Sequence, residues 1–269
     1  MEPTIDYARY ESLAITKEAG VATVVLNRPD TLNAIDATLH RELATIFDDL
    51  ADDAEVSVVV LTGAGRAFCA GGDLNWLTRQ IEHRQPFLHS LREGRKIVAG
   101  VLECPKPVIC RINGDAIGFG ATLALLCDII VAVDSARIAD PHVRIGLVAG
   151  DGGALIWPQL VGYARAKEFL LTGNSLDAGE AARIGLINYS VAEADLDATV
   201  QRFARQIANG AQSAIRYTKM CTNLPLRQMI ASVLDNSLAC EGLTLLQNGE
   251  LKEGIAAFRE GRKPRFPAP

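Results

Sequence analysis

The chain has 269 residues, 49% of them hydrophobic and 22% charged, which is the composition of a globular protein with a sizeable core. Its net charge of −5 offers no basic excess for nucleic acid. The first residues lack the regions of a secretory signal, and the longest apolar stretch, residues 124–133, is too short to cross a bilayer, so we expect a cytoplasmic protein without membrane contact.

Strand-like and helix-like segments alternate through the first half of the chain. Residues 13–17 and 21–26 predict a β-hairpin, and either Asn33 or Asp36 is placed to cap a helix that runs to Leu50. Further strands are expected at 56–63, 106–114 and 128–133, with helices over 76–103 and 120–126. This alternation predicts an α/β fold with a mostly parallel sheet.

The last quarter of the sequence is helical in character. Amphipathic patterns predict helices over 196–209, 211–223, 226–247 and 251–260. We therefore expect a core over residues 1–195 and a helical region over residues 196–269, whose apolar faces are able to meet another subunit.

Two glycine-rich segments stand out within the core. Residues 68–74 and residues 112–120 each follow a strand-like apolar run, and each places small residues where backbone must approach something closely. Two such loops are able to present two main-chain N–H groups to one carbonyl oxygen. That arrangement is an oxyanion hole, which stabilises an enolate or a tetrahedral intermediate.

The ordered set of motifs resembles the enoyl-CoA hydratase/isomerase (crotonase) superfamily over nearly the whole chain. The matching segments are Asn27-Arg28-Pro29 with Asn33-Ala34, residues 65–74, residues 113–129, Leu170-Leu171-Thr172-Gly173, residues 178–186 and residues 253–258. The resemblance implies a spiral of ββα turns and a C-terminal helical trimerisation region, hence a homotrimer or a dimer of trimers. It also implies a thioester site whose oxyanion N–H groups belong to Gly72 and Phe119.

The same resemblance implies that coenzyme A enters as part of an acyl-CoA substrate, with no permanently bound cofactor. The residues that it places near the coenzyme are Arg28, Arg66, Ala70, Lys219 and Phe258, with the basic Arg262 and Lys263 as further candidates. No metal site is expected, because the histidines and acids show no ligand spacing and the six cysteines stand singly, as reduced thiols.

The sequence departs from the family at its acid–base positions. A typical hydratase of the family has two glutamates there, whereas this chain has Thr122 and His142. Threonine has no useful pKa near neutrality, so we expect His142 to be the general base. Asp151, nine residues on in a glycine turn, is placed to orient it, if His142 ends an extended segment and Asp151 is more than a helix cap.

Other polar and aromatic residues near the site carry weaker signals. Thr122 is expected either to bind water or substrate or simply to fill space, and neither Asp115 nor Asp140 is directed at the substrate by the alignment. Glu241, on a C-terminal helix, is able to approach the acyl pocket, but a solvated helix face is the favoured expectation. Core packing is the favoured role for Trp76, Phe87 and Trp157, and no partner is indicated for His40, His83 or His89.

Three functions remain open from the sequence. The first is an acyl-CoA lyase of the hydratase type that uses the Gly72 and Phe119 N–H groups and a His142–Asp151 pair. The second is a CoA-independent hydrolase of β-diketones, because one branch of the superfamily is similar in its His–Asp spacing and in a following Trp-Pro, here Trp157-Pro158. The third is a catalytically silent binding subunit, considered because both glutamates are missing.

Overall fold

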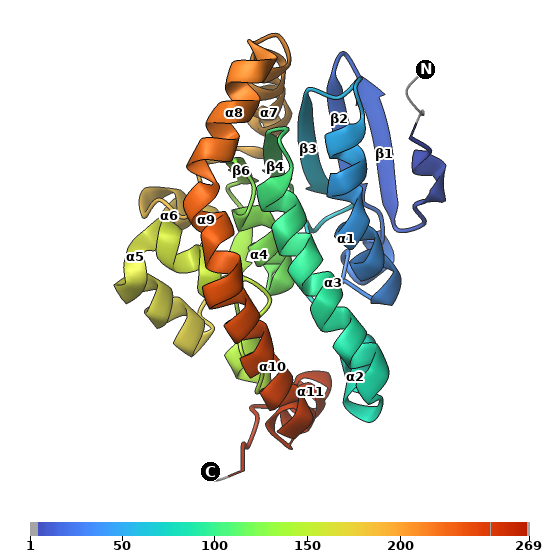
Figure 1. Cartoon of the computed structure of the whole chain (residues 1–269). Helices are drawn as coiled ribbons and strands as arrows, with labels where there is room; N and C mark the ends of the chain where they lie inside the picture. The colour runs from blue at the N-terminus through green and yellow to red at the C-terminus, as the bar shows by residue number, and fades with distance from the viewer. Residues whose placement is uncertain (1–4, 248, 268–269) are drawn as a thin grey trace.

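The computed structural model describes residues 5–247 and 249–267, and its main sheet has six strands (Figure 1). In spatial order these are β1 (Leu13–Glu18), β2 (Val21–Leu26), β3 (Val58–Gly63), β4 (Val108–Ile112), β6 (Ile129–Val133) and β9 (Tyr189–Val191). β1 and β2 form the predicted antiparallel hairpin, and the other neighbours are parallel. The predicted, mostly parallel α/β sheet is confirmed.

A smaller sheet of three strands carries the segments that line the candidate site. Its order is β5 (Ala116–Ile117), β7 (Arg137–Ala139) and β8 (Leu176–Asp177). β5 is followed by α4 (Phe119–Leu125), and β7 by the 3-10 helix η3 (His142–Ile145). Because β5 and β7 are hydrogen-bonded parallel neighbours, the segments that follow them begin side by side.

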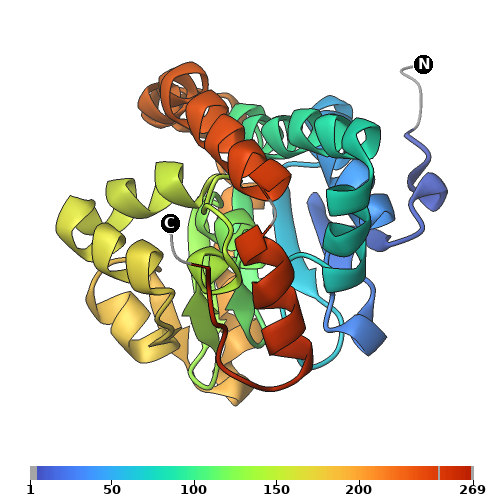
Figure 2. The same ribbon diagram turned by 90° about the horizontal axis from the view of Figure 1, so that it is seen from below.

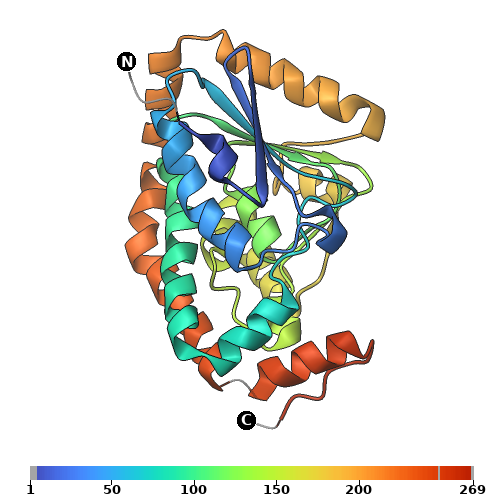
Figure 3. The same cartoon turned by 90° about the vertical axis from the view of Figure 1, so that its right-hand side faces the viewer.

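Helices cover the main sheet. α7 (Glu193–Ala208) lies across β2, β3, β4 and β6 (Figure 3), while α1 (Ala37–Asp52) packs along α3 (Arg84–Glu103) (Figure 1). This cover explains why all six residues of β3 are buried. Asp36 caps α1, because its Oδ1 accepts hydrogen bonds from the N–H groups of Thr38 and Leu39, so of the two predicted caps it is not Asn33 that serves.

The lower end of the molecule is closed by short helices. α11 (Gly249–Arg259) contacts both η3 and α2 (Leu74–Glu82), and it lies in front of the core when the molecule is seen from below (Figure 2). Outside the C-terminal helices, the other elements are η1 (Tyr7–Arg9), η2 (Pro29–Thr31), α5 (Gly153–Thr172, bent at Gly162) and α6 (Ala178–Arg183).

The C-terminal helices form one long arm beside α3 and α5. They are α8 (Gln212–Thr222), α9 (Leu224–Met229), the π-helical turn η4 (Ile230–Leu234) and α10 (Asp235–Gln247). Since α7 covers the sheet, the helices that extend beyond the core begin with α8, whereas the predicted division at residues 195–196 lies in the first turn of α7.

One stretch of the described residues, Leu224–Gln247, has the length and apolar composition that a membrane-spanning helix requires. A third of its most apolar window is buried within the fold, and it packs against α3 and α5. Helices in the cores of folded domains meet the same criteria, so this stretch carries no membrane assignment.

Candidate active site

The two glycine-rich segments meet, as the sequence predicts. The N–H of Ile117 donates to the carbonyl of Cys69 at 2.9 Å, and Cys69 and Ala116 form an isolated parallel bridge. At the contact, Gly71 has φ +88°, and a Cβ there would lie 2.8 Å from the Ile117 carbonyl oxygen. A side chain at this position would therefore separate the two segments.

Gly72 and Phe119 both line one cavity, whose volume is about 390 Å³. Phe119 is the first residue of α4, so its N–H has no acceptor within the helix. Among the described residues, no backbone carbonyl outside regular helices and strands accepts a hydrogen bond from either N–H group. Two amides are thus placed at the wall of one cavity.

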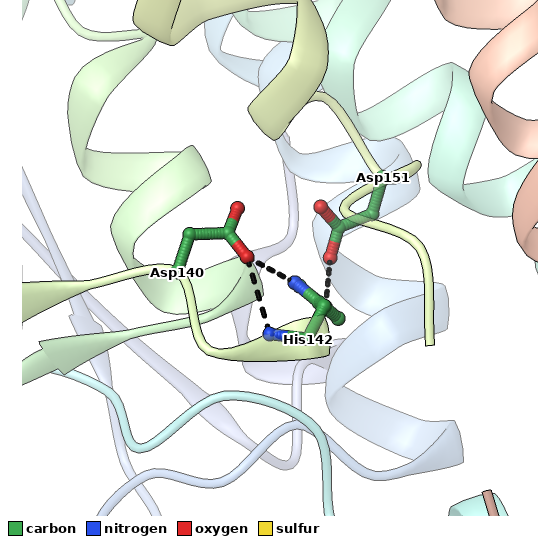
Figure 4. Close-up of side chains that lie close together, drawn as sticks. All are labelled: Asp140, His142 and Asp151. Carbon is green, nitrogen blue, oxygen red and sulfur yellow. Dashed lines mark hydrogen bonds and ion pairs between the residues drawn. The ribbon is translucent and has the colours of Figure 1, made fainter. Parts of the chain in front are cut away.

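His142 is held on one side by a carboxylate that the sequence did not assign. Its Nδ1 lies 2.5 Å from Oδ1 of Asp140, and its backbone N–H donates to the same oxygen at 3.4 Å (Figure 4). His142 opens the 3-10 helix η3 instead of ending an extended segment, which corrects the predicted local structure. The turn at Pro141 brings the imidazole back onto the aspartate two residues earlier.

Asp151 faces the other nitrogen of the imidazole. Its Oδ2 lies 3.1 Å from Nε2 of His142, so the ring stands between two carboxylates (Figure 4). Asp151 does not cap α5, because Gly152 is the N-cap and no side chain caps that helix. The sequence therefore predicted the contact of His142 with Asp151 but not the second contact, between Asp140 and Nδ1.

The side chain of Thr122 contacts the carboxylate of Asp151. Its side chain is fully buried, and its hydroxyl donates to Oδ1 of Asp151 at 3.3 Å. Thr122 does not line the cavity. Of the expected alternatives, a direct role at the substrate receives no support from this placement, and the threonine instead positions Asp151.

The two carboxylates favour a charged imidazole. Burial alone would lower the pKa of His142, but the charges and hydrogen bonds of Asp140 and Asp151 outweigh it and raise the pKa well above its usual value. Asp140 is itself fully buried, and its Oδ2 lies at the start of α5, where the helix dipole stabilises negative charge. In this state both ring nitrogens carry protons and donate them to carboxylates.

For Glu241 the less favoured of the two expectations is the one that the structure supports. It was expected on a solvated face, yet it lines the cavity, and its Oε2 is buried without a hydrogen-bond partner. Burial, followed by the negative charge of Asp151, raises its pKa to about 8. Helical periodicity from Leu234 and Leu238 would have indicated that Glu241 faces inward, because both are buried and lie on the same side of the arm.

Aromatic residues form part of the cavity wall. Trp76 and Phe87 line it, although core packing was the favoured expectation for both, whereas Trp157 is fully buried against Phe169 as expected. His40 also lines the cavity and packs at a tilt against Trp76, with ring centroids 5.0 Å apart. The sequence indicated no partner for His40, but its Nδ1 lies 2.8 Å from Oε2 of Glu93.

The residues predicted to contact coenzyme A fall into two groups. Ala70 and Phe258 line the cavity, and the Phe258 side chain is largely exposed. Arg66 is exposed, and Arg28 pairs with Asp36 at 3.0 Å, both outside the cavity wall.

Lys219 does not fit its predicted role. Its ammonium group is buried, lies 2.8 Å from Oδ2 of Asp128 and donates to the carbonyl of Lys106 at 3.0 Å. This internal ion pair holds α8 to the start of β4, so the cation is not available to a phosphate.

Asp140, His142 and Asp151 also satisfy the spacing of a cation site, since one ligand atom from each lies within 4.8 Å of the others. The sequence predicts no metal here. The hydrogen-bonded arrangement accounts for all three side chains, because each carboxylate takes a different nitrogen of the ring. Treatment with EDTA distinguishes a cation site from the hydrogen-bonded arrangement.

Known proteins match this fold and sequence over nearly their full length. A 1,2-epoxyphenylacetyl-CoA isomerase of Escherichia coli is 35% identical, with 93% of this chain and 95% of the relative covered. A crystal structure of an enoyl-CoA hydratase/isomerase from Mycobacterium paratuberculosis matches with a TM-score of 0.88 at 35% identity, covering 91% of this chain and 97% of that one. A β-diketone hydrolase of the cyanobacterium Anabaena, bound to (S)-3-oxocyclohexyl acetic acid, matches with a TM-score of 0.83 at 28% identity, covering 90% and 96%.

The family assignment follows from these matches together with the fold. The solved structures share the predicted crotonase-type α/β architecture. The model of the enoyl-CoA hydratase/isomerase family matches residues 16–269. The chain therefore belongs to the enoyl-CoA hydratase/isomerase family.

Proposed function

We propose that the protein is an enzyme that acts on an acyl-CoA thioester. The thioester oxygen accepts hydrogen bonds from the N–H groups of Gly72 and Phe119, and these bonds strengthen as negative charge develops on it. The observation that carries the proposal is the imidazole of His142, held between two carboxylates at the cavity that both amides line.

Proton transfer is assigned to Asp151 backed by His142, which revises the role expected of the histidine. An imidazole that donates from both nitrogens has no lone pair with which to accept a proton. The carboxylate of Asp151 lines the cavity and keeps acceptor capacity. Asp151 therefore takes the proton, while His142, oriented by Asp140, stabilises the charged form of Asp151.

Glu241 supplies the complementary acid. With a pKa of about 8 it is protonated at neutral pH and has an O–H to donate in the same cavity. A buried acid beside an ionised carboxylate permits one group to accept a proton while the other donates one. Hydration and double-bond isomerisation then differ in whether Asp151 takes its proton from water or from the carbon next to the thioester.

Hydrolysis of a β-diketone is the second candidate function. It is favoured by the structural match to the Anabaena β-diketone hydrolase. In that reaction Asp151 takes a proton from water, the hydroxide adds to one carbonyl, and the carbon–carbon bond breaks. The enolate that leaves is stabilised by the two amides and is then protonated.

Parallel measurements on the same preparation separate these functions. The lead proposal expects crotonyl-CoA or another enoyl-CoA to be converted, and acetoacetyl-CoA to raise the melting temperature where free diketones do not. Turnover of a simple β-diketone without coenzyme A would favour the hydrolase instead. A silent binding subunit would show no activity that the His142→Ala substitution reduces.

A further inference from the structure

The wall of the cavity formed by α1, α2 and α3 contains polar side chains that the proposed chemistry does not use. His40, Gln80 and Ser90 line it, one from each helix, among the apolar side chains of Trp76 and Phe87. All three polar residues are at least nine-tenths buried. Buried polar groups are costly unless they are hydrogen-bonded, so their placement in an acyl cavity requires a reason.

Gln80 is the unsatisfied member of this group. Its Nε2 is buried and has no hydrogen-bond partner, although the side chain lies at the cavity wall. Leaving such a buried donor unpaired costs free energy. An oxygen atom of a bound molecule would remove that cost.

The pairing of His40 with Glu93 fixes the orientation of the imidazole. Its Nδ1 lies 2.8 Å from Oε2 of Glu93. Burial raises the pKa of Glu93, but the hydrogen bond and charge of His40 outweigh it and hold the pKa below its usual value. The other ring nitrogen, Nε2, faces the space left by Gly94, 3.8 Å from where a Cβ of that residue would stand.

We propose that this wall binds a hydroxyl group on the acyl part of the substrate, distant from the thioester. The inference rests on the proposed function for the direction from which the acyl group enters. A hydroxyl oxygen accepts from the Gln80 Nε2, and a hydroxyl is able to pair with the His40 Nε2 as either donor or acceptor, whereas an alkyl end satisfies neither. The aromatic rings around it contact the apolar body of the same acyl group.

Matched ligands test the proposal by binding and not by turnover. Dissociation constants are measured calorimetrically for 6-hydroxyhexanoyl-CoA and heptanoyl-CoA, which differ only by hydroxyl against methyl at the end of a saturated chain. We expect tighter binding of the hydroxy member by about tenfold or more, because a polar site left unpaired rejects an alkyl group. Phenol and toluene, measured by ligand-detected NMR, give the same comparison without coenzyme A.

The Gln80→Met variant isolates the contribution of the amide, because methionine keeps the length of the side chain. We expect this variant to lose most of the preference within each pair, while Gln206→Leu, on the exposed face of α7, keeps it. The circular dichroism spectrum and melting temperature of each variant provide the control for folding.

Three results would overturn the proposal. They are equal binding within both pairs, an unchanged preference in a folded Gln80→Met variant, and tighter binding of adipoyl-CoA than of the hydroxy thioester, which would mean that the wall selects a carboxylate. If no thioester binds but phenol is still preferred over toluene, the proposed function fails and the hydroxyl site stands.

Discussion

At the scale of single residues, the environment of His142 decides its chemistry. In most His–carboxylate pairs one nitrogen remains free, but here Asp140 and Asp151 occupy both. The charged ring is therefore the stable form at neutral pH, and we assign the role of the general base to the carboxylate of Asp151.

Replacing Asp140 with Asn tests this arrangement. Loss of the negative charge should lower the pKa of His142, which NMR titration of the imidazole measures directly. Because the pKa of His142 is raised in the folded state, its stabilising contribution is fully present below about pH 6.5 and is lost as pH rises through the folded pKa. The melting temperature of Asp140→Asn should thus fall most, relative to the parent, in acid. An unchanged pKa would contradict the assigned contact.

Substitutions of the acid–base residues should separate their roles. We expect both Asp151→Asn and His142→Ala to lower kcat by about 100-fold or more, the scale of a positioned acid or base. If His142 alone were the base, Asp151→Asn would retain much more activity. Circular dichroism and melting temperature provide the control for folding, and addition of EDTA should leave the parent rate unchanged. A rate lost to EDTA and restored by a divalent cation would instead assign the cluster to a metal.

The Glu241→Gln variant should differ from the parent in the pH dependence of its stability and of kcat in alkaline solution. The pKa of this carboxyl group is about 8 in the folded chain against an ordinary value of 4.5, so the group binds its proton more tightly when folded, and the parent loses stability as pH rises across that range. The variant has no such group, and its advantage in unfolding free energy should grow by roughly 3 kcal/mol from pH 6 to pH 9. The alkaline fall of kcat near pH 8 should also be missing in the variant. Parallel stability curves would refute the buried acid.

These residues show which contacts of the candidate site could be predicted from the sequence. The convergence of the glycine segments and the proximity of His142 to Asp151 followed from local motifs. The contact of Asp140 did not, because it depends on the turn at Pro141 that reverses the chain after β7. The burial of Glu241 and the pairing of His40 with Glu93 depend on how distant helices pack, and a single sequence carries little of that information.

At the scale of elements, the start of α5 and helix α10 of the arm hold the loop that contains Asp151 in place. The Ser237 hydroxyl of α10 donates to the carbonyl of Gly150 at 2.7 Å. The π-helical turn η4 precedes α10 and shifts the phase of the arm by one residue, and such turns recur at functional sites. The sequence predicted a single helix over 226–247, because a π-turn leaves no clear mark on apolar periodicity.

Gly153→Ala should disturb the site through this element. A Cβ at residue 153 would lie 2.2 Å from Oδ2 of Asp140, so the carboxylate or the helix must move. We expect a loss of about 1–3 kcal/mol in unfolding free energy together with a lower pKa of His142. Gly179→Ala in α6 is the matched control, since its Cβ would meet only the Asp177 side chain at 3.3 Å and alanine favours a helix. Equal stability of both variants would contradict the crowding.

At the scale of the whole molecule, the strands predicted for the main sheet from β1 to β6 are present, whereas the sequence analysis placed no strand at β5, β7, β8 or β9. Alternating apolar runs and turn residues are local signals, so the sequence carries them well. The choice of neighbours in the sheet and the closure of the lower end by α11 are long-range features, which local patterns do not carry. The association of subunits is a further feature of this kind.

Assembly into trimers or pairs of trimers remains a prediction, and the surface of the arm gives it a physical basis. Large apolar side chains are exposed on α5, which packs beside the arm, and on α8 and α10 of the arm: Tyr163, Leu171, Tyr217 and Leu243, each more than half exposed. One exposed leucine is ordinary, but several on neighbouring helices indicate a surface that another subunit covers.

Sedimentation velocity at micromolar concentration should give the mass of three or six chains. The Leu171→Asp, Leu243→Asp double variant should shift it toward one chain, because two charges would be buried in the contact. Leu88→Asp, at a less exposed leucine on α3, serves as the matched control and should leave the mass unchanged. A parent that sediments as one chain would remove the arm as an assembly surface and leave its apolar residues to another partner.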